Sequence, residues 1–166
     1  MNEKKIEKYT LKKIGTFNFG SIKMVSHILK DCGEDMYNKY GLTHWKNSYF
    51  KTLLITIYLS LKNQIWLLVD GNDAIATFQT KVVGDGLHFS KLAVSPSRAG
   101  QGVGSVCLAY MEKIARESGA NKLLCEVYDK SEHARVFYEK KGFAENGNIN
   151  TLKYSEIKLE KRLDIQ

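Results

Sequence analysis

Residues 92–105 read Leu-Ala-Val-Ser-Pro-Ser-Arg-Ala-Gly-Gln-Gly-Val-Gly-Ser, which joins an apolar strand end to three alternating glycines and then to a helical pattern. Glycine has no Cβ, so Gly100, Gly102 and Gly104 let the main chain turn tightly and come close to a ligand. The first N–H groups of the helix that follows have no acceptor within it, and they attract anions at the positive end of the helix dipole. This stretch predicts a loop that binds a phosphate-bearing cofactor.

Two familiar phosphate loops do not fit these residues. A nucleotide P-loop ends in Gly-Lys followed by Ser or Thr, whereas this loop ends Gly104-Ser105-Val106 without the lysine. A dinucleotide-binding fold places its glycines after an early first strand, whereas these lie past the middle of the chain. A glycine-rich turn that binds nothing is the simplest alternative, and the order of strand, loop and helix favours a phosphate site over it.

The composition is that of an ordinary globular protein. The chain has 166 residues, of which 43% are hydrophobic and 26% are charged, and it contains one proline. This length suits a single domain over residues 1–166. The apolar runs are too short to span a membrane, and the first residues lack the apolar core of a secretory signal. We therefore expect a cytoplasmic protein with no membrane partner.

The cysteines predict neither disulfides nor a metal centre. Cys32, Cys107 and Cys125 are odd in number, lie among apolar neighbours and show no Cys-x-x-Cys spacing. This usage is typical of buried free thiols in a reducing compartment. We expect no metal site.

The charge points to an anionic partner without identifying it. The formal net charge is +7, which favours either a cofactor with several phosphates or a nucleic acid. The lysines are spread along the chain in short clusters, as on an ordinary solvated surface. A nucleic-acid partner is therefore disfavoured, although it is not excluded.

Apolar periodicity and turn residues predict alternating strands and helices. Gly119 is placed to end the helix that follows the glycine loop. The predicted strands cover 9–15, 64–70, 74–82, 87–94, 122–128 and 153–163, and the predicted helices cover 20–38, 50–61, 103–118 and 131–141. Strands clustered early, followed by a strand-helix-strand-helix core, predict an α/β fold with a mixed sheet and helices on both faces.

Two motifs in this order resemble those of the GNAT superfamily of acyl-CoA-dependent N-acyltransferases. The first is the strand end 92–94 with Pro96 and the loop 100–105, which looks like the family's pyrophosphate-binding segment. The second begins at 125–127 and ends in Tyr138-x-x-x-Gly142-Phe143, like the family's strand and following helix. The resemblance covers nearly the whole chain. It implies a mostly antiparallel sheet of about six or seven strands flanked by about four helices.

The resemblance implies acetyl-CoA as cosubstrate. Backbone groups of Leu92, Ala93 and Val94 would pair with its pantetheine arm, and one of these N–H groups would polarise the thioester carbonyl, which can supply about 3 kcal/mol. Arg98 or Lys130 could meet the outer phosphates. The other cofactor-binding residues that the resemblance implies are Ala99, Gly100, Gln101, Gly102, Val103, Gly104 and Ser105 for the pyrophosphate, with Ser131 and Ala134 on the later helix.

The same resemblance places two catalytic candidates. Tyr138 lies where many members keep a proton donor for the departing thiolate, although the phenol could instead be packed beside Phe137 and Phe143. Glu126 lies where some protein-acetylating members keep a general base, and a carboxylate between apolar strand residues suits that role. The alternatives are a carboxylate at the sheet rim paired with a lysine, and His88 as the base.

The chain departs from the family pattern at two positions. The Arg or Gln that usually begins the phosphate loop falls on Ala99, because Arg98 stands one position early. The asparagine expected near the start of the later helix is replaced by Ser131, which we expect to cap that helix and to make a shorter contact with the cofactor.

The acceptor is the least determined part of the prediction. Aromatic residues crowd the segment between the first two helices, which in this fold borders the acceptor site: Tyr37, Tyr40, His44, Trp45 and Tyr49. An aromatic wall favours a small-molecule primary amine, acetylated by direct attack in a ternary complex. The alternatives are a protein N-terminus or lysine, the amino group of aminoacyl-tRNA in a toxin-like enzyme, and a non-catalytic acyl-CoA-binding module. A homodimer is also possible.

Overall fold

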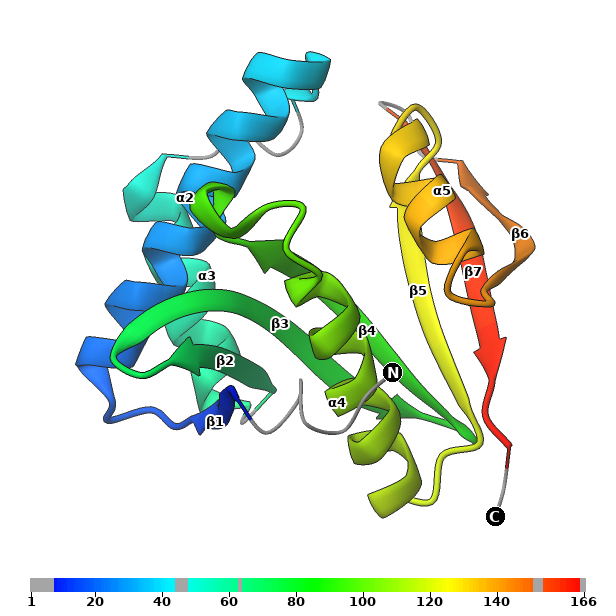
Figure 1. Cartoon of the computed structure of the whole chain (residues 1–166), viewed down its shortest axis with the longest axis horizontal. Coiled ribbons are helices and arrows are strands. Elements are labelled where there is room, and N and C mark those ends of the chain that lie inside the picture. Colours follow the sequence, from blue (N-terminus) through cyan, green and yellow to red (C-terminus); the bar gives the residue numbers. More distant parts are fainter. Residues whose placement is uncertain (1–7, 44–47, 63, 151–153, 165–166) are drawn as a thin grey trace. The chain divides into compact units, whose positions relative to one another are not determined.

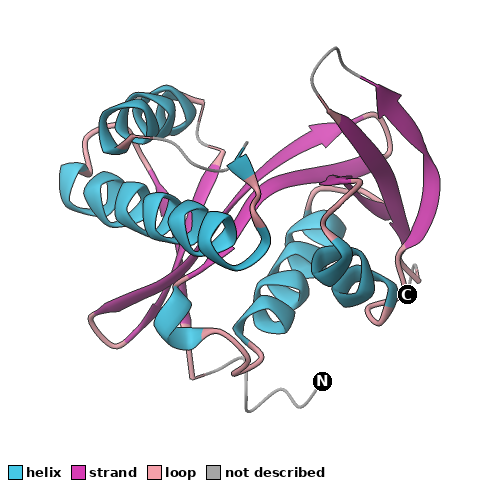
Figure 2. Cartoon of the chain, turned by 90° about the horizontal axis from the view of Figure 1, so that it is seen from above, coloured by secondary structure: helices cyan, strands magenta, loops and turns pink. Residues whose placement is uncertain are grey.

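The computed structural model describes residues 8–43, 48–62, 64–150 and 154–164. Within these ranges the chain forms seven strands and four α-helices, with one 3-10 turn (Figure 1). In chain order they are β1 (Thr10–Ile14), α2 (Phe19–Tyr40), α3 (Tyr49–Leu61), β2 (Ile65–Asp70), β3 (Asp73–Val83), β4 (Gly86–Val94), η2 (Pro96–Arg98), α4 (Val103–Glu117), β5 (Lys122–Tyr128), α5 (Glu132–Glu139), β6 (Ala144–Asn150) and β7 (Ser155–Arg162). Figure 2 shows how much of the described chain lies in these elements.

The strands form one mixed sheet in the order β1-β2-β3-β4-β5-β7-β6. The pairs β1–β2, β2–β3, β5–β7 and β6–β7 are antiparallel, whereas β4–β5 is parallel. A parallel pair needs a long crossover connection, and α4 lies in the connection between β4 and β5. This topology confirms the α/β fold with a mixed, mostly antiparallel sheet that the sequence predicts.

The chain divides into two compact units that share three elements. The first unit comprises residues 1–80 and 91–110, and the second comprises residues 81–90 and 111–166. Strands β3 and β4 and helix α4 each contribute residues to both.

In the first unit, helices α2 and α3 cover strands β1 and β2. Ile14 faces Ile65 across the β1–β2 pair, and both side chains are buried in a core with Ile22 and Val25 of α2. Asn18 fixes the start of α2, because its Oδ1 accepts a hydrogen bond of 3.1 Å from the Ser21 N–H. The apolar periodicity of residues 22–36 therefore predicts the buried face of this helix correctly.

Helix α3 buries a row of hydroxyl side chains that the predicted apolar pattern does not place in the core. Its hydroxyl side chains Thr52, Thr56 and Ser60 are buried, and Ser26 of α2 donates to Thr56 Oγ1 over 3.2 Å. Each of the three hydroxyls also donates to a main-chain carbonyl three or four residues earlier, so none needs water. The predicted apolar stripe is wrong for the exposed Phe50, Leu54 and Leu61, whereas Leu53 and Ile57 of the same stripe are partly buried and pack against the core.

In the second unit, strand β5 runs beside β7, and helix α5 ends against a buried aromatic cluster. On β5, Leu123, Cys125 and Val127 are buried, while the alternate residues are half-exposed. At the end of α5, the Phe143 N–H donates to the Tyr138 carbonyl and the Gly142 N–H donates to the Glu139 carbonyl. With Gly142 at φ 82°, this is the Schellman pattern. The Tyr-x-x-x-Gly-Phe motif is therefore a helix stop.

Strand β6 is absent from the sequence prediction. Its residues, Ala144–Asn150, include Gly147 and three asparagines, which are poor strand formers. It nevertheless pairs with β7, through a register shift between Glu145 and Asn148. The predicted final strand 153–163 agrees with β7 over Ser155–Arg162, and residue 153 lies outside the described residues.

Candidate functional site

The parallel pairing of β4 with β5 extends over only three residues of each strand. The register joins Gly86, Leu87 and His88 to Lys122, Leu123 and Leu124, and it ends there. Three residues later, Lys91 adopts a φ of 52°, a left-handed conformation that is uncommon for a residue with a side chain. The sequence contains no signal for this break, because a lysine within an apolar strand looks like any exposed strand residue.

The predicted pantetheine-binding residues follow this irregularity at the end of β4. Leu92 and Val94 are half-buried, whereas Ala93 is buried in the core of the first unit. The side chain of Ala93 is therefore committed to packing, so this residue can offer only main-chain groups. That the backbone of these residues, and no side chain, meets the cosubstrate stays a prediction.

The glycine loop between η2 and α4 is open at its surface. Gly100 and Gly102 adopt φ values of 74° and 81°, and no protein atom lies within 4 Å of a Cβ built on Gly100. The N–H groups of Ser105 and Val106 donate to the Gly102 carbonyl over 3.1 and 3.2 Å, so the helical hydrogen bonds begin here. The backbone N–H groups just before Ser105 come ahead of the first helical hydrogen bond, so they project outward at the N-terminus of the helix. This geometry fits a diphosphate.

The remaining loop residues have different surroundings. Ala99 and Gln101 are exposed, and Gly104 lies within α4. Val103 is only 2% exposed, so its side chain belongs to the core and its backbone alone is available to a ligand. Gln101 Nε2 donates to the Ser97 carbonyl over 3.1 Å, which folds this side chain back onto the turn η2.

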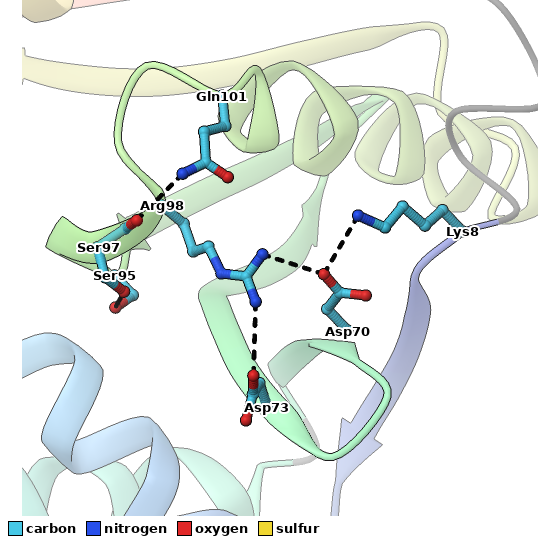
Figure 3. A network of polar contacts seen from close by, with 7 residues as sticks. All are labelled: Lys8, Asp70, Asp73, Ser95, Ser97, Arg98 and Gln101. Atoms are coloured by element: carbon cyan, nitrogen blue, oxygen red, sulfur yellow. Dashed lines mark hydrogen bonds and ion pairs between the residues drawn. The ribbon is translucent and has the colours of Figure 1, made fainter.

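Arg98 points away from the glycine loop toward the β2–β3 hairpin (Figure 3). Its Nη1 donates to Asp70 Oδ2 over 3.1 Å, and its Nη2 donates to Asp73 Oδ2 over 3.4 Å. None of the motifs in the sequence predicts this network. Its one visible signal is a pair of aspartates around Gly71-Asn72, which also suits an ordinary turn. Lys130, the other residue considered for the outer phosphates, is exposed.

His88 is the last paired residue of β4, and its side chain contacts Glu126, which lies two residues beyond the last paired residue of β5. His88 Nε2 lies 2.6 Å from Glu126 Oε2, and the two side chains are 28% and 27% exposed. Glu126 therefore occupies the half-exposed face of β5, which corrects the expectation of an apolar environment. Lys158 is its cross-strand neighbour on β7, yet the short contact of the carboxylate is with histidine. The two residues considered as rival bases thus form one pair.

Tyr138 is packed among aromatic rings in the second unit. It is 8% exposed, and its ring centroid lies 5.8 Å from that of Phe89 and 5.2 Å from that of Phe143. Phe137 lies beside it at 5.1 Å. The aromatic packing considered as an alternative in the sequence analysis is therefore present, and the acid role of the phenol stays a prediction.

The start of α5 differs from the expected cap. Ser131 is buried at the N-cap position, and its carbonyl accepts from the Ala134 and Arg135 N–H groups over 3.0 and 3.1 Å. Its side chain makes no capping hydrogen bond, so the expectation of a serine hydroxyl cap is wrong. The backbone at Ser131 has a φ of −85° and a ψ of 67°, unlike the β-region conformation usual for a capping serine. Ala134 is half-buried on the first turn of this helix.

The aromatic residues proposed to border an acceptor are only partly described. Tyr37 and Tyr40 are exposed near the end of α2, and Tyr49 packs its ring 4.8 Å from that of His27. The predicted residues His44 and Trp45 lie outside the described residues.

The three cysteines are buried and poorly reactive. Burial raises the pKa of the Cys32 thiol to about 11 and that of the Cys107 thiol to about 12. Burial also raises the pKa of the Cys125 thiol, with nearby Glu126 adding to the effect. No cluster of three or more His, Cys, Asp or Glu residues suited to a metal occurs in the part of the chain that the structure describes. No α-helix there is long and apolar enough to cross a membrane.

The predicted site residues fall into two groups. Leu92 to Ser105, with Arg98, belong to the first compact unit. The second group belongs to the second unit and consists of His88, Glu126, Ser131, Ala134 and Tyr138. Within each group the structure brings together one polar cluster, around Arg98 in the first unit and around Glu126 in the second.

Comparisons with known proteins give one family and one fold. The model of the acetyltransferase (GNAT) family matches residues 22–143. A comparison with curated proteins found no match. Among solved structures, the PaiA N-acetyltransferase of Thermoplasma acidophilum in complex with coenzyme A is 16% identical, with a TM-score of 0.71 over 93% of this chain and 98% of that chain.

Two further structures have the same fold. The ribosomal-protein-S18-alanine N-acetyltransferase of Escherichia coli is 20% identical, with a TM-score of 0.68 over 95% of this chain and 96% of that chain. An aminoglycoside 6'-acetyltransferase type Ii is 17% identical, with a TM-score of 0.73 over 95% of this chain and 99% of that chain. At such low identities these likenesses concern the fold alone.

Proposed function

The chain belongs to the acetyltransferase (GNAT) family and is an acyltransferase, and on this premise we propose that it moves an acetyl group from acetyl-CoA to a primary amine of a small molecule. The observation that carries the proposal is the glycine loop, where Gly100 and Gly102 have left-handed φ values and the backbone at Gly100 is unhindered just before the helix α4. Two structural neighbours were crystallised with coenzyme A, which supports the same cosubstrate here.

In this proposal main-chain groups at the end of β4 and in the glycine loop bind the cosubstrate. Acetyl-CoA brings the acyl group as an activated thioester. The amides around Gly102 hold its pyrophosphate, and an N–H group from Leu92 to Val94 polarises the thioester carbonyl. Because these donors are backbone groups held by β4 and α4, they are already in place when charge develops on the oxygen.

Side chains that the family resemblance assigns to catalysis carry the proton chemistry in this proposal. Glu126 takes a proton from the incoming ammonium group, and the adjacent His88 holds the carboxylate and gives the proton a route onward to solvent. The free amine then forms the new C–N bond as the C–S bond breaks, and its nitrogen loses a second proton to solvent as it becomes an amide. Tyr138 gives its proton to the leaving sulfur, which departs as the thiol of CoA, and the phenol regains a proton from solvent.

The buried cysteines support direct transfer over an acyl-enzyme. A cysteine nucleophile reacts as its thiolate, and the raised pKa values of the three thiols keep them protonated at neutral pH. Their side chains are also buried and so are hidden from a substrate. An amine that attacks the thioester itself needs no such group.

Two observations support the proposed acceptor class. Tyr37 and Tyr40 expose aromatic rings, which suit the apolar body of a small amine. An aminoglycoside acetyltransferase is among the structural neighbours, and so is an enzyme for the alanine of a ribosomal protein. A protein N-terminus is therefore the second candidate acceptor.

The test is an acceptor panel read by mass spectrometry. The full chain is incubated with acetyl-CoA and, separately, with polyamines, aminoglycosides, amino acids, N-terminal peptides and aminoacyl-tRNA. We expect one small-molecule class to gain the mass of a single acetyl group. Acetylation of peptides or of aminoacyl-tRNA alone would contradict the proposed acceptor. Binding of acetyl-CoA with no product from any amine would favour the non-catalytic module instead.

A further inference from the structure

A pair of carboxylates ties the segment before the glycine loop to the β2–β3 hairpin (Figure 3). Arg98 reaches Asp70 with one terminal nitrogen, over 3.1 Å, and Asp73 with the other, over 3.4 Å. Asp70 and Asp73 are paired across the hairpin, at the turn formed by Gly71 and Asn72. One guanidinium therefore bridges the ends of both hairpin strands.

Asp70 is the more important of the two partners. Arg98 and Asp70 are 27% and 20% exposed, whereas Asp73 is 77% exposed. An exposed ion pair contributes little, so most of the stabilisation comes from the sheltered Asp70 contact. Lys8 Nζ lies 3.4 Å from the same Asp70 oxygen, which places this carboxylate between two cations.

Hydrogen bonds fix the rest of the segment as well. The Ser95 N–H donates to the Ile75 carbonyl over 2.9 Å, and the Arg98 N–H donates to the Ser95 carbonyl over 2.8 Å. Gln101 then reaches back to Ser97 with its side-chain amide, as Figure 3 shows. The chain is thus held from β3 through η2 up to the first glycine of the loop.

From this geometry we infer that Arg98 is a positioning residue for the pyrophosphate of acetyl-CoA, acting through the loop and without touching a phosphate. Both of its terminal nitrogens are directed at the hairpin carboxylates, which the planar fork of arginine suits better than lysine does. A loop fixed in advance loses less conformational freedom when the ligand binds. The inference rests on the proposed function, because it takes the loop as the pyrophosphate site.

A positioning role and a phosphate-binding role for Arg98 predict opposite effects of Asp70→Asn on the binding of CoA. If Arg98 positions the loop, Asp70→Asn removes the anchor and weakens binding just as Arg98→Gln does. If Arg98 is a phosphate ligand, Asp70→Asn frees the guanidinium, so binding stays the same or becomes tighter. A contact with the 3′-phosphate would in addition make Arg98 responsible for any preference for CoA over dephospho-CoA.

Calorimetry on the full chain separates these roles. The dissociation constants of CoA and dephospho-CoA are measured for the wild type, Arg98→Gln, Arg98→Lys, Asp70→Asn and the double variant Arg98→Gln/Asp70→Asn. We expect each single variant to bind both ligands about tenfold more weakly, and the double variant to be no worse than either single variant. We expect the preference between the two ligands to stay unchanged and the lysine not to restore binding.

Activity and stability measurements complete the test. In the variants the KM for acetyl-CoA should rise while kcat at saturation stays near the wild-type value, because the reacting groups are untouched. Arg116→Gln, which removes another arginine–carboxylate pair at the end of α4, is the matched control and should leave both constants unchanged. Melting curves confirm that each variant is folded, and Arg98→Lys remains informative if Arg98→Gln fails to fold.

Three results would decide against the inference or its premise. Unchanged or tighter CoA binding by Asp70→Asn would overturn the positioning role. Loss of the preference for CoA over dephospho-CoA in Arg98→Gln would overturn it in favour of a direct phosphate contact. A wild type that binds no CoA would remove the proposed function itself, which is a different outcome from a wild type that binds while the variants are unaffected.

Discussion

At the scale of single residues, the pair His88 and Glu126 has the clearest chemical consequence. A contact of 2.6 Å between an imidazole nitrogen and a carboxylate oxygen is a short, charge-assisted hydrogen bond. Both groups are about a quarter exposed, so solvent can reach them. Such a pair can take up a proton at one end and release it at the other.

Glu126→Gln should therefore lower kcat by about 100-fold or more, because a positioned base typically contributes that much. His88→Gln should lower it by less, and the double variant should be no slower than Glu126→Gln, since residues acting as one unit are not additive. Steady-state rates at saturating acetyl-CoA check this. Glu112→Gln, which removes a carboxylate paired with Lys161 at 2.7 Å, is the control and should keep the wild-type rate. Full activity in Glu126→Gln would contradict the base role.

Tyr138 allows a test that separates packing from chemistry. Tyr138→Phe keeps the ring contacts with Phe89 and Phe143, so the variant should remain folded, which melting curves check. The loss of the phenol proton should lower kcat by about 100-fold. Tyr110→Phe is the matched control, because it removes a phenol that donates to the Tyr9 carbonyl, and it should cost stability and not rate. An unchanged kcat in Tyr138→Phe would leave the tyrosine with a packing role only.

His133 predicts a dependence of stability on pH. Burial lowers the pKa of this imidazole below its ordinary value of 6.5, so between the two values the unfolded chain binds more protons at this residue than the folded chain does. The contribution of the neutral ring is complete above pH 6.5 and is lost as the pH falls toward the lower folded pKa. His133→Gln should flatten this part of the stability curve, as measured by urea unfolding at several pH values. An identical curve for the variant would contradict the prediction.

At the scale of elements, the glycine loop combines backbone strain with an open surface. Gly100 and Gly84 both adopt left-handed φ values, 74° and 59°, and both lack protein atoms within 4 Å of an added Cβ. A methyl group at either position meets nothing in the protein and costs only backbone strain, about 1 to 2 kcal/mol. The two positions differ in their proposed surroundings, because we propose that the pyrophosphate binds beside Gly100 and not beside Gly84.

Gly100→Ala should weaken CoA binding about tenfold or more, because its methyl group projects toward the pyrophosphate and shifts the adjacent amides. Gly84→Ala, in the β3–β4 turn, should lose similar stability and leave CoA binding unchanged. Calorimetry and melting curves on both variants provide the comparison. Equal CoA affinity in the two variants would place the pyrophosphate somewhere other than this loop.

The elements also show where sequence reasoning succeeds and where it fails. Helix stops at Gly41, Gly119 and Gly142 carry a local signal, since a left-handed residue is needed and glycine supplies it. The orientation of α3 carries no such signal, because buried hydroxyls satisfied by α2 and by main-chain carbonyls contradict the apolar pattern. Strand β6 is missed for a similar reason, since its pairing with β7 overrides its poor propensity.

Some parts of the candidate site are predicted from the sequence, whereas contacts between distant residues are not. The glycine loop and the Tyr138 position follow from short motifs, which are visible within a few residues. The His88–Glu126 pair joins residues 38 apart in sequence, so it depends on the register of β4 with β5. The commitment of Arg98 to Asp70 depends on the course of the β2–β3 hairpin, 28 residues away. Spacing within one segment reveals neither contact.

At the scale of the whole molecule, β3, β4 and α4 each run through both compact units. If one unit unfolds, elements that also belong to the other unit are disrupted. We therefore propose that residues 1–166 unfold as a single domain, as the length of the chain suggests.

A single calorimetric unfolding transition should check this proposal, with equal calorimetric and van't Hoff enthalpies. Adding CoA at 100 times its dissociation constant should stabilise the folded chain by about 2.7 kcal/mol and shift that one transition upward. Two separate transitions, of which CoA moves only one, would instead show units that unfold independently.

Because all three cysteines are buried, catalysis can be followed with a reagent that gives a coloured product when it reacts with free thiols. A soluble aromatic disulfide reagent reacts with accessible thiolates, and the sulfhydryls of this chain are both enclosed and held protonated by their raised pKa values. The CoA set free at each turnover is then the source of absorbance, with a flat baseline from the native protein. A stepwise rise equivalent to three sulfhydryls per chain would mark denatured material in the cuvette.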